Sequence, residues 1–295
     1  MTQQIPMSPS ARADRAESHD HTLEIAPDLA YQRHAIVNVV YWGTPLAGDR
    51  NWVLIDAGIM GSMSAIERAA TERFGPGARP DPIVLTHGHF DHVGVLEDLA
   101  EKWDVPVYAH ALEASYLNGR ATYPPPDPGV GGGLIALSSS LFPTAPVDVG
   151  SRLRLLPEDG SVPPMPGWKW LHTPGHAPGH VSFWREADRS LIVGDAFVTT
   201  AQESAYSVAT QEPELHGPPK YFTPEGDKAG ESVRKLAALE PELVVTGHGR
   251  AVRAGQMRAA LQELALRFED VTVPQGAIYT RHPARAEDGS AYRKP

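Results

Sequence analysis

The chain alternates short apolar runs with amphipathic segments, and this alternation predicts its secondary structure. Apolar positions at helical spacing predict helices at Ser64–Phe74, Val93–Trp103, Lys228–Leu239 and Ala254–Phe268. Seven apolar runs bounded by turn residues are typical of buried strands, and they span residues 52–58, 82–88, 105–110, 168–175, 180–184, 190–196 and 243–249. Because strands and helices interleave, we expect a layered α/β or α+β fold.

Two long irregular segments interrupt this alternation. Residues 116–146 are dense in Pro and Gly and contain the apolar stretch LIALSSSLF, and residues 199–224 follow the sequence GDAF. Irregular segments of this length are typical of lids or binding loops. We therefore divide the chain into a flexible, polar N-terminal arm (1–24), one main domain (25–275) and a C-terminal tail (276–295).

Composition and charge narrow the classes of partner. The 295 residues are 41% hydrophobic and 21% charged, as in an ordinary globular protein, and the net charge of −10 disfavours a nucleic-acid surface. The chain has no cysteine, so any metal site must use histidine and carboxylate ligands. No apolar run resembles a signal peptide or a membrane span. We expect a cytoplasmic protein with a small-molecule substrate and neither nucleic acid nor membrane as partner, and a homodimer stays open.

The sequence THGHFDH is the densest cluster of titratable residues in the chain. It follows a predicted strand and precedes a predicted helix, so His87, His89, Asp91 and His92 share one strand-to-helix turn. Neutral imidazole and carboxylate together suit zinc, iron or manganese. The motif therefore predicts a metal site.

Three further turns repeat this arrangement of a strand followed by a glycine and a ligand-type residue. TPGHAPGH contains His176 and His180, VGDA contains Asp195, and TGHG contains His248. Glycine permits the sharp turn and close backbone approach that a buried site needs. Taken singly, an Asp in such a turn is more often a helix cap and a His more often a satisfied polar contact, so His176, Asp195 and His248 are only candidate ligands at this point. We interpret His180 as a structural hydrogen-bonding residue.

In this order, the motifs resemble those of the metallo-β-lactamase-fold hydrolases, over roughly residues 30 to 270. The resemblance implies a four-layer αββα sandwich with two mixed β-sheets, and a catalytic domain at 25–275. It also implies a binuclear centre in which two metals share a carboxylate. The ligands implied are His87, His89 and His176 for one metal, Asp91, His92 and His248 for the other, and Asp195 as the bridge. Asp56, in the early LIDAG strand, is implied to orient the metal-binding turn.

The resemblance further implies hydrolysis by a metal-bridging hydroxide. Two divalent ions, zinc first and iron or manganese as alternatives, would activate water and polarise the scissile bond. Asp91 is the residue expected to carry a proton to the leaving group. An ester or lactone with an apolar body fits the apolar character of the surrounding loops.

Departures from individual branches of the family leave the substrate open. Glyoxalase II enzymes place basic residues after the bridging Asp, whereas this chain has none until Lys220. Lactonases of this fold place a tyrosine three residues after that Asp, where this chain has Val198, so Tyr206 or Tyr221 would have to polarise the carbonyl. Thioester, phosphotriester and promiscuous β-lactam hydrolysis remain alternatives.

Two other function classes share the fold. One is an iron-dependent oxidoreductase similar to persulfide dioxygenases, which use a single metal; His248, a ligand for a second metal, makes it less favoured. The other is a non-catalytic metal-stabilised binding module, which would be expected to have lost ligands. All seven ligand positions are retained here.

Overall fold

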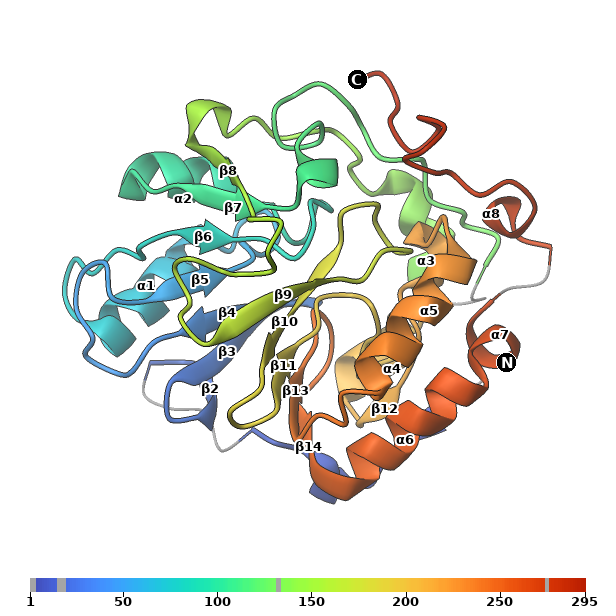
Figure 1. Cartoon of the computed structure of the whole chain (residues 1–295), viewed down its shortest axis with the longest axis horizontal. Coiled ribbons are helices and arrows are strands. Elements are labelled where there is room, and N and C mark those ends of the chain that lie inside the picture. Colours follow the sequence, from blue (N-terminus) through green and yellow to red (C-terminus); the bar gives the residue numbers. More distant parts are fainter. Residues whose placement is uncertain (1–3, 15–19, 131–133, 274–275) are drawn as a thin grey trace.

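A seven-stranded mixed sheet forms one half of the protein (Figure 1). The computed structural model describes residues 4–14, 20–130, 134–273 and 276–295. Strands β2 to β5 pair antiparallel, and β5 to β8 pair parallel. The strands are β2 (Leu23–Ala26), β3 (Leu29–His34), β4 (Val37–Trp42), β5 (Val53–Ile55), β6 (Ile83–Val84), β7 (Val107–Ala109) and β8 (Leu153–Leu155).

A five-stranded mixed sheet forms the other half, in the order β14-β13-β11-β10-β9. Only β11 and β13 pair parallel. The strands are β9 (Trp168–His172), β10 (Val181–Arg185), β11 (Ser190–Ile192), β13 (Leu243–Val245) and β14 (Val252–Arg253). A separate two-stranded sheet joins β1 (Ile5–Pro6) to β12 (Glu214–Leu215).

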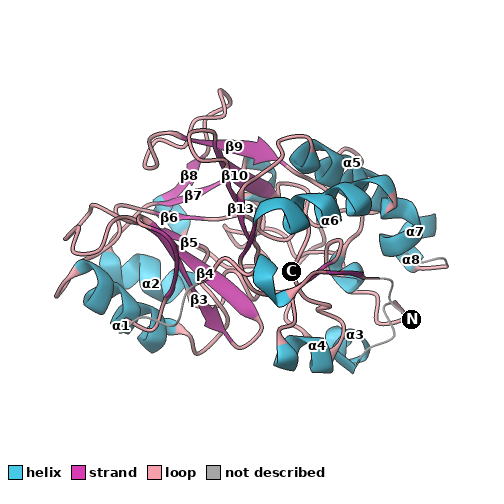
Figure 2. Ribbon diagram, turned by 90° about the horizontal axis from the view of Figure 1, so that it is seen from below, coloured by secondary structure: helices cyan, strands magenta, loops and turns pink. Residues whose placement is uncertain are grey.

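Helices cover the outer face of each large sheet (Figure 2). Helices α1 (Met63–Phe74) and α2 (Leu96–Trp103) pack on the first sheet, and α5 (Gly226–Ala237) and α6 (Ala254–Leu266) pack on the second. The shorter helices are α3 (Leu134–Ser138), α4 (Ala205–Thr210), α7 (Phe268–Thr272) and α8 (Ile278–Arg281). The expected four-layer αββα sandwich with two mixed sheets is confirmed.

Alternation within the strands explains why their sequences are apolar throughout. In β5, Val53 and Ile55 face the core between the sheets, whereas Leu54 faces the helices. In β13, Val245 faces the other sheet and Val244 faces α5 and α6. Successive side chains of a strand point to opposite faces, so a strand buried on both faces needs an unbroken apolar run.

The four predicted long helices are present, with shifted ends. The helix expected at Val93–Trp103 begins at Leu96, because Val93–Val95 belong to the turn that leaves the metal motif. The helix expected at Ala254–Phe268 ends at Leu266, and α7 follows. The seven predicted strands are also present, as β5, β6, β7, β9, β10, β11 and β13. The strands that lie outside the predicted set are β1, β2, β3, β4, β8, β12 and β14. The strands β2, β3 and β4 pair with one another along residues 23–42, a stretch that carries no ligand motif.

The described part of the N-terminal arm lies against the domain. Ile5 is buried in the core beside α6, and the backbone N–H of Ala13 donates to the carbonyl of Ala251. The C-terminal tail also contacts the domain, because the carbonyl of Ala291 accepts a hydrogen bond from the hydroxyl of Tyr116. The proposed domain limits stay a prediction. Among the described residues, no helix is long and apolar enough to cross a membrane.

Candidate metal centre

Four strand ends bring the predicted ligands to one edge of the sandwich. The THGHFDH turn follows β6, the TPGH turn follows β9, and the other two turns follow β11 and β13. Parallel pairing of β11 with β13 places Asp195 and His248 at the same edge. All seven side chains are buried, namely His87, His89, Asp91, His92, His176, Asp195 and His248.

The seven side chains form three overlapping groups, each able to hold a metal. In every group the candidate ligand atoms lie within 4.8 Å of one another. The groups are His87, His89 and His176; His87, His92 and Asp195; and Asp91, His92 and His248. Asp195 lies between the histidines of both predicted metal sites, since its carboxylate is 2.9 Å from His248 Nε2 and 3.5 Å from His176 Nε2.

Individual separations fit ligands of one small cation. Nδ1 of His89 lies 2.9 Å from Nε2 of His176, and Nε2 of His248 lies 3.5 Å from Oδ2 of Asp91. Two donors that bind one tetrahedral zinc at about 2.0–2.1 Å lie about 3.3 Å from each other. The observed separations bracket this value.

Unpartnered polar atoms point to the same conclusion. Nε2 of His87, Nε2 of His92 and Oδ1 of Asp195 are buried and hydrogen-bond to none of the described residues. Buried polar atoms are almost always paired, and an unpaired set at one point is typical of an ion site. These residues therefore fit divalent metal ions.

Hydrogen bonds to the opposite ring nitrogens fix the orientation of the histidines. Nδ1 of His87 lies 3.0 Å from the Thr86 hydroxyl, and Nδ1 of His92 lies 2.8 Å from Oδ2 of Asp56. Asp56 also accepts hydrogen bonds from the N–H and the hydroxyl of Thr86. Such contacts hold Nε2 toward the metal position. Asp56 therefore lies where the resemblance placed it, whereas Thr86 was not predicted, although its place beside His87 was the available signal.

The pKa values of the site residues follow from burial and mutual contact. Burial and the neighbouring His92 lower the pKa of His87 well below its ordinary value. Burial opposes ionisation of Asp195, but His248 and His92 hold the pKa of this carboxyl well below its usual range. Burial opposes protonation of His92 and His248, but Asp195 beside them raises the pKa of both. A metal requires neutral imidazole, so binding of an ion would displace the protons of these two residues.

Glycine at two of the turns is required by close packing. A Cβ atom on Gly247 would lie 2.0 Å from Oδ1 of Asp195, and one on Gly194 would lie 2.6 Å from Nε2 of His180. His180 makes the structural hydrogen bonds expected of it, because its Nε2 accepts from the N–H of Asp195 and its Nδ1 pairs with Thr173. The glycines thus let the ligand turns pack together.

An aromatic cluster covers the centre. The ring of Phe222 stacks on His89 at a centroid distance of 4.9 Å, and Phe90 and Phe142 pack beside it. Tyr221 is buried in the same cluster, within the 3-10 turn η5 (Lys220–Phe222), and burial followed by the charge of Asp91 raises its pKa. Tyr206 lies on α4 with 72% of its surface exposed. Of the two tyrosines, the structure brings only Tyr221 close to the described metal ligands.

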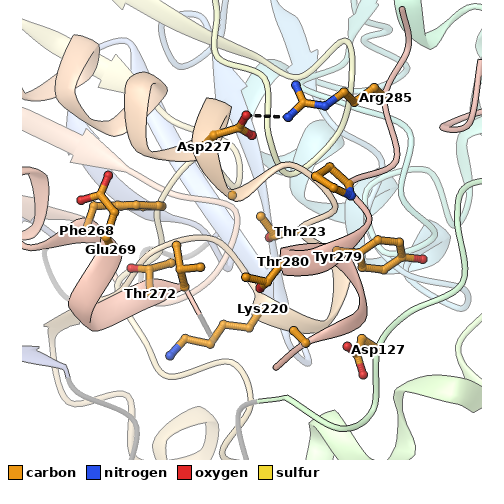
Figure 3. A pocket seen from close by; sticks show the side chains of 14 residues that line it. Asp127, Lys220, Thr223, Asp227, Phe268, Glu269, Thr272, Tyr279, Thr280 and Arg285 are labelled. Atoms are coloured by element: carbon orange, nitrogen blue, oxygen red, sulfur yellow. Dashed lines mark hydrogen bonds and ion pairs between the residues drawn. The ribbon is translucent and has the colours of Figure 1, made fainter. Parts of the chain in front are cut away.

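A cavity lies on the other side of this aromatic cluster. Its volume is about 430 Å³, and the labelled residues in Figure 3 surround it. The η5 turn, α7 and α8 provide its walls, including Lys220, Thr272 and Thr280. Thr223 connects this cavity with the metal centre, because its hydroxyl lies 3.3 Å from Nδ1 of His176. The sequence carried no signal for the role of Thr223.

Comparisons with known proteins agree with the fold and the motifs. A family model described as the metallo-beta-lactamase superfamily matches residues 37–248. The chain is 47% identical over 236 residues to "Probable metallo-hydrolase YflN" of Bacillus subtilis (strain 168), covering 80% of this chain and 89% of that protein. It is 30% identical over 199 residues to "Probable metallo-hydrolase YybB" of the same organism, covering 68% and 76%.

A solved structure extends the likeness to the whole sandwich. The crystal structure of a beta-lactamase domain protein from Burkholderia ambifaria aligns with a TM-score of 0.60 at 21% identity, covering 88% of this chain and 79% of that one. At this identity the likeness concerns the fold alone. From the family match, the 47% identical relative and the seven convergent candidate ligands, we conclude that the chain belongs to the metallo-beta-lactamase superfamily.

Proposed function

We propose that this protein is a hydrolase with two divalent metal ions, zinc first, that cleaves a small ester or lactone with a largely apolar body. The observation that carries the proposal is the convergence of three candidate ligand groups, in which Nε2 of His87, Nε2 of His92 and Oδ1 of Asp195 are buried without a hydrogen-bond partner among the described residues. The printed names of the two Bacillus relatives support hydrolysis as the reaction class.

The side chains around the centre have separate tasks in this proposal. His87, His89 and His176 would hold one ion, Asp91, His92 and His248 would hold the other, and Asp195 would be shared between the two sites. When bound, such ions lower the pKa of water to about 7 and polarise a carbonyl oxygen. Asp91, a candidate ligand of the second site, would take a proton from the attacking water and pass it to the leaving group.

Tyr221 supplies a hydrogen bond to the substrate carbonyl in this proposal. Burial and nearby carboxylates raise the pKa of its hydroxyl, so the phenol stays protonated and able to donate. It replaces the tyrosine that lactonases of this fold carry where this chain has Val198. A donor aimed at the developing oxyanion stabilises the transition state more than the ground state.

The surroundings support an uncharged, partly apolar substrate. Phe90, Phe142 and Phe222 cover the centre, and among the described residues no Lys or Arg lines the narrow space beside His89 and His176. The 430 Å³ cavity behind the η5 turn, whose lining also includes the charged side chains of Lys220, Asp227 and Arg285, provides room for the part of the substrate that does not react.

Proton release in weak buffer tests the proposal. Metal-loaded protein and its Asp91→Asn variant are compared on lactones, aryl esters, glutathione thioesters, phosphotriesters and β-lactams. We expect rapid acid release from lactones or aryl esters, abolished in the variant. Release from another class alone would replace the substrate assignment. No release from any class, together with oxygen uptake by iron-loaded protein on a persulfide, would establish the oxidoreductase alternative.

A further inference from the structure

A fully buried carboxylate lies behind the metal-binding turns. Glu113 ends the 3-10 turn η2 (Ala111–Glu113), which follows β7, and has no exposed surface. It belongs to none of the three candidate ligand groups, and among the described residues it forms no ion pair. Burying a carboxylate without a cation is unfavourable, and burial accordingly raises the pKa of Glu113. Such a residue calls for a specific explanation.

The carboxylate joins two separate turns of the metal centre. Its Oε2 accepts a hydrogen bond of 3.0 Å from the N–H of Gly88, which stands between His87 and His89. Its Oε1 accepts one of 2.7 Å from the N–H of Gly179, three residues after His176. These three histidines form one candidate ligand group. Glu113 therefore links the backbones that carry all three ligands of one metal.

Tyr123 completes this link. Its hydroxyl donates to Oε2 of Glu113 and accepts a hydrogen bond of 2.9 Å from the N–H of Gly88. Its ring lies 4.3 Å from the ring of His89, centroid to centroid. The irregular segment 116–146 thus contributes a side chain that contacts both a ligand and the carboxylate behind it.

Gly88 and Gly179 pack closely against Tyr123 and Glu113. A Cβ atom on Gly88 would lie 2.7 Å from the Tyr123 hydroxyl, and one on Gly179 would lie 2.8 Å from Cγ of Glu113. The turn at Gly179 approaches Glu113, and the turn at Gly88 approaches Tyr123, as closely as a backbone without a side chain permits. Their separation is consequently set by the carboxylate between them.

We propose that Glu113 is a positioning residue that holds the His87–His89 turn and the His176 turn at the separation required to bind the first metal. This inference rests on the proposed metal site but not on which bond is hydrolysed. When bound, the two ions would supply the positive charge that no described side chain provides to this buried carboxylate. Glu113→Gln removes the negative charge of the carboxylate. It also replaces one acceptor oxygen by an amide NH₂ group, which would face a backbone N–H donor.

Site-selective metal affinity tests the proposal. Zinc affinity is measured by competition with a chromophoric chelator, in a His248→Ala background that isolates the first site and a His176→Ala background that isolates the second. Adding Glu113→Gln is expected to weaken the first site by about 10- to 100-fold and the second by much less. A merely structural defect would weaken both sites equally. Glu214→Gln is the matched control, since that buried carboxylate accepts from the N–H of Ala201 away from both turns.

The outcomes separate this inference from the proposed function. Two zinc ions in the wild type with an unchanged first site in Glu113→Gln would overturn the positioning role alone. Absence of zinc binding by the wild type would overturn the metal site and the proposed function with it. If Glu113→Gln does not fold, Tyr123→Phe carries the test, because it keeps the carboxylate and removes one donor. We expect it to weaken the first site selectively but less, and an unchanged first site would count against the role.

Discussion

Nδ1 of His92 lies 2.8 Å from Oδ2 of Asp56, a residue at the end of β5 that the chain separates from His92 by 36 positions. Asp56 adopts a left-handed backbone conformation with φ of 64°, which directs its carboxylate toward the metal-binding turn. The same carboxylate accepts the N–H of Thr86, so one side chain fixes both the start of the turn and the ring of a ligand. Orientation of His92 is therefore decided outside the ligand motif.

Asp56→Asn should lower the affinity for the second metal by about 10- to 100-fold, with a matching loss of activity at limiting zinc. The amide can still accept from Thr86 but presents a donor to Nδ1 of His92, and asparagine tolerates the left-handed conformation. Chelator competition measures the effect. Asp159→Asn, in an exposed turn, is the control. Equal zinc affinity in both variants would contradict an orienting role for Asp56.

Gly247→Ala should release at least one zinc ion while the fold persists. The new Cβ atom would lie 2.0 Å from Oδ1 of Asp195, so the bridging carboxylate must move. Metal content after gel filtration checks this expectation. Gly255→Ala is matched to it, because no heavy atom lies within 4 Å of that Cβ position in α6. The control should retain its zinc and gain up to about 0.5–1 kcal/mol in stability.

Tyr221→Phe should reduce kcat on the preferred ester or lactone by about 100- to 1000-fold, because it removes the donor to the carbonyl oxygen. Tyr206→Phe should leave kcat unchanged, since that side chain is 72% exposed on α4. Steady-state kinetics on both variants compare the two tyrosines directly. The opposite pattern would assign the carbonyl contact to Tyr206 and imply that α4 moves over the centre.

Thr280→Trp should raise KM with little change in kcat if the substrate body occupies the cavity in Figure 3. Thr280 stands on the exposed rim of that cavity, so an indole there fills space without disturbing the core. We expect KM to rise roughly tenfold, because the substitution would remove binding that the substrate and the transition state share equally. Thr71→Trp, on the exposed face of α1, should change neither constant. Unchanged KM in both variants would place the substrate elsewhere.

His34 should make the protein less stable in mild acid. Burial lowers the pKa of His34 to about 4, and the unfolded chain has a value of about 6.5. The folded state therefore binds fewer protons between these values, so this stabilisation is complete above about pH 6.5 and decreases as the pH falls toward 4. Lowering the pH from about 7 to about 5 should reduce the free energy of unfolding of both proteins. The reduction should be about 2 kcal/mol smaller in His34→Phe than in the wild type.

Urea unfolding of both metal-free proteins at the two pH values measures this difference. The side chain of His34 is buried and its Nε2 atom has no hydrogen-bond partner among the described residues, so phenylalanine replaces it with little loss of contact. Identical pH dependence in the two proteins would show that His34 does not titrate in this interval.

The local sequence determined the chemistry of the centre. Four ligand-type residues within THGHFDH, and the glycine-flanked His176, Asp195 and His248, stand directly after apolar strands. Strand ends meet at the edge of a sheet, so pairing of the strands brings these residues together. The interleaving of apolar runs and amphipathic segments similarly determined the layered class, because each strand must be buried and each helix must cover a face.

Tertiary structure alone decided how the centre is held and which loop covers it. Glu113 contacts Gly88 and Gly179 across 25 and 66 residues, and no pattern within η2 distinguishes it from a surface glutamate. Tyr206 and Tyr221 both lie in the irregular segment 199–224, yet one is exposed on a helix and the other is buried among Phe90, Phe142 and Phe222. Spacing along the chain predicts local turns. These relationships depend instead on which distant segments pack together, and that packing is determined by the fold as a whole.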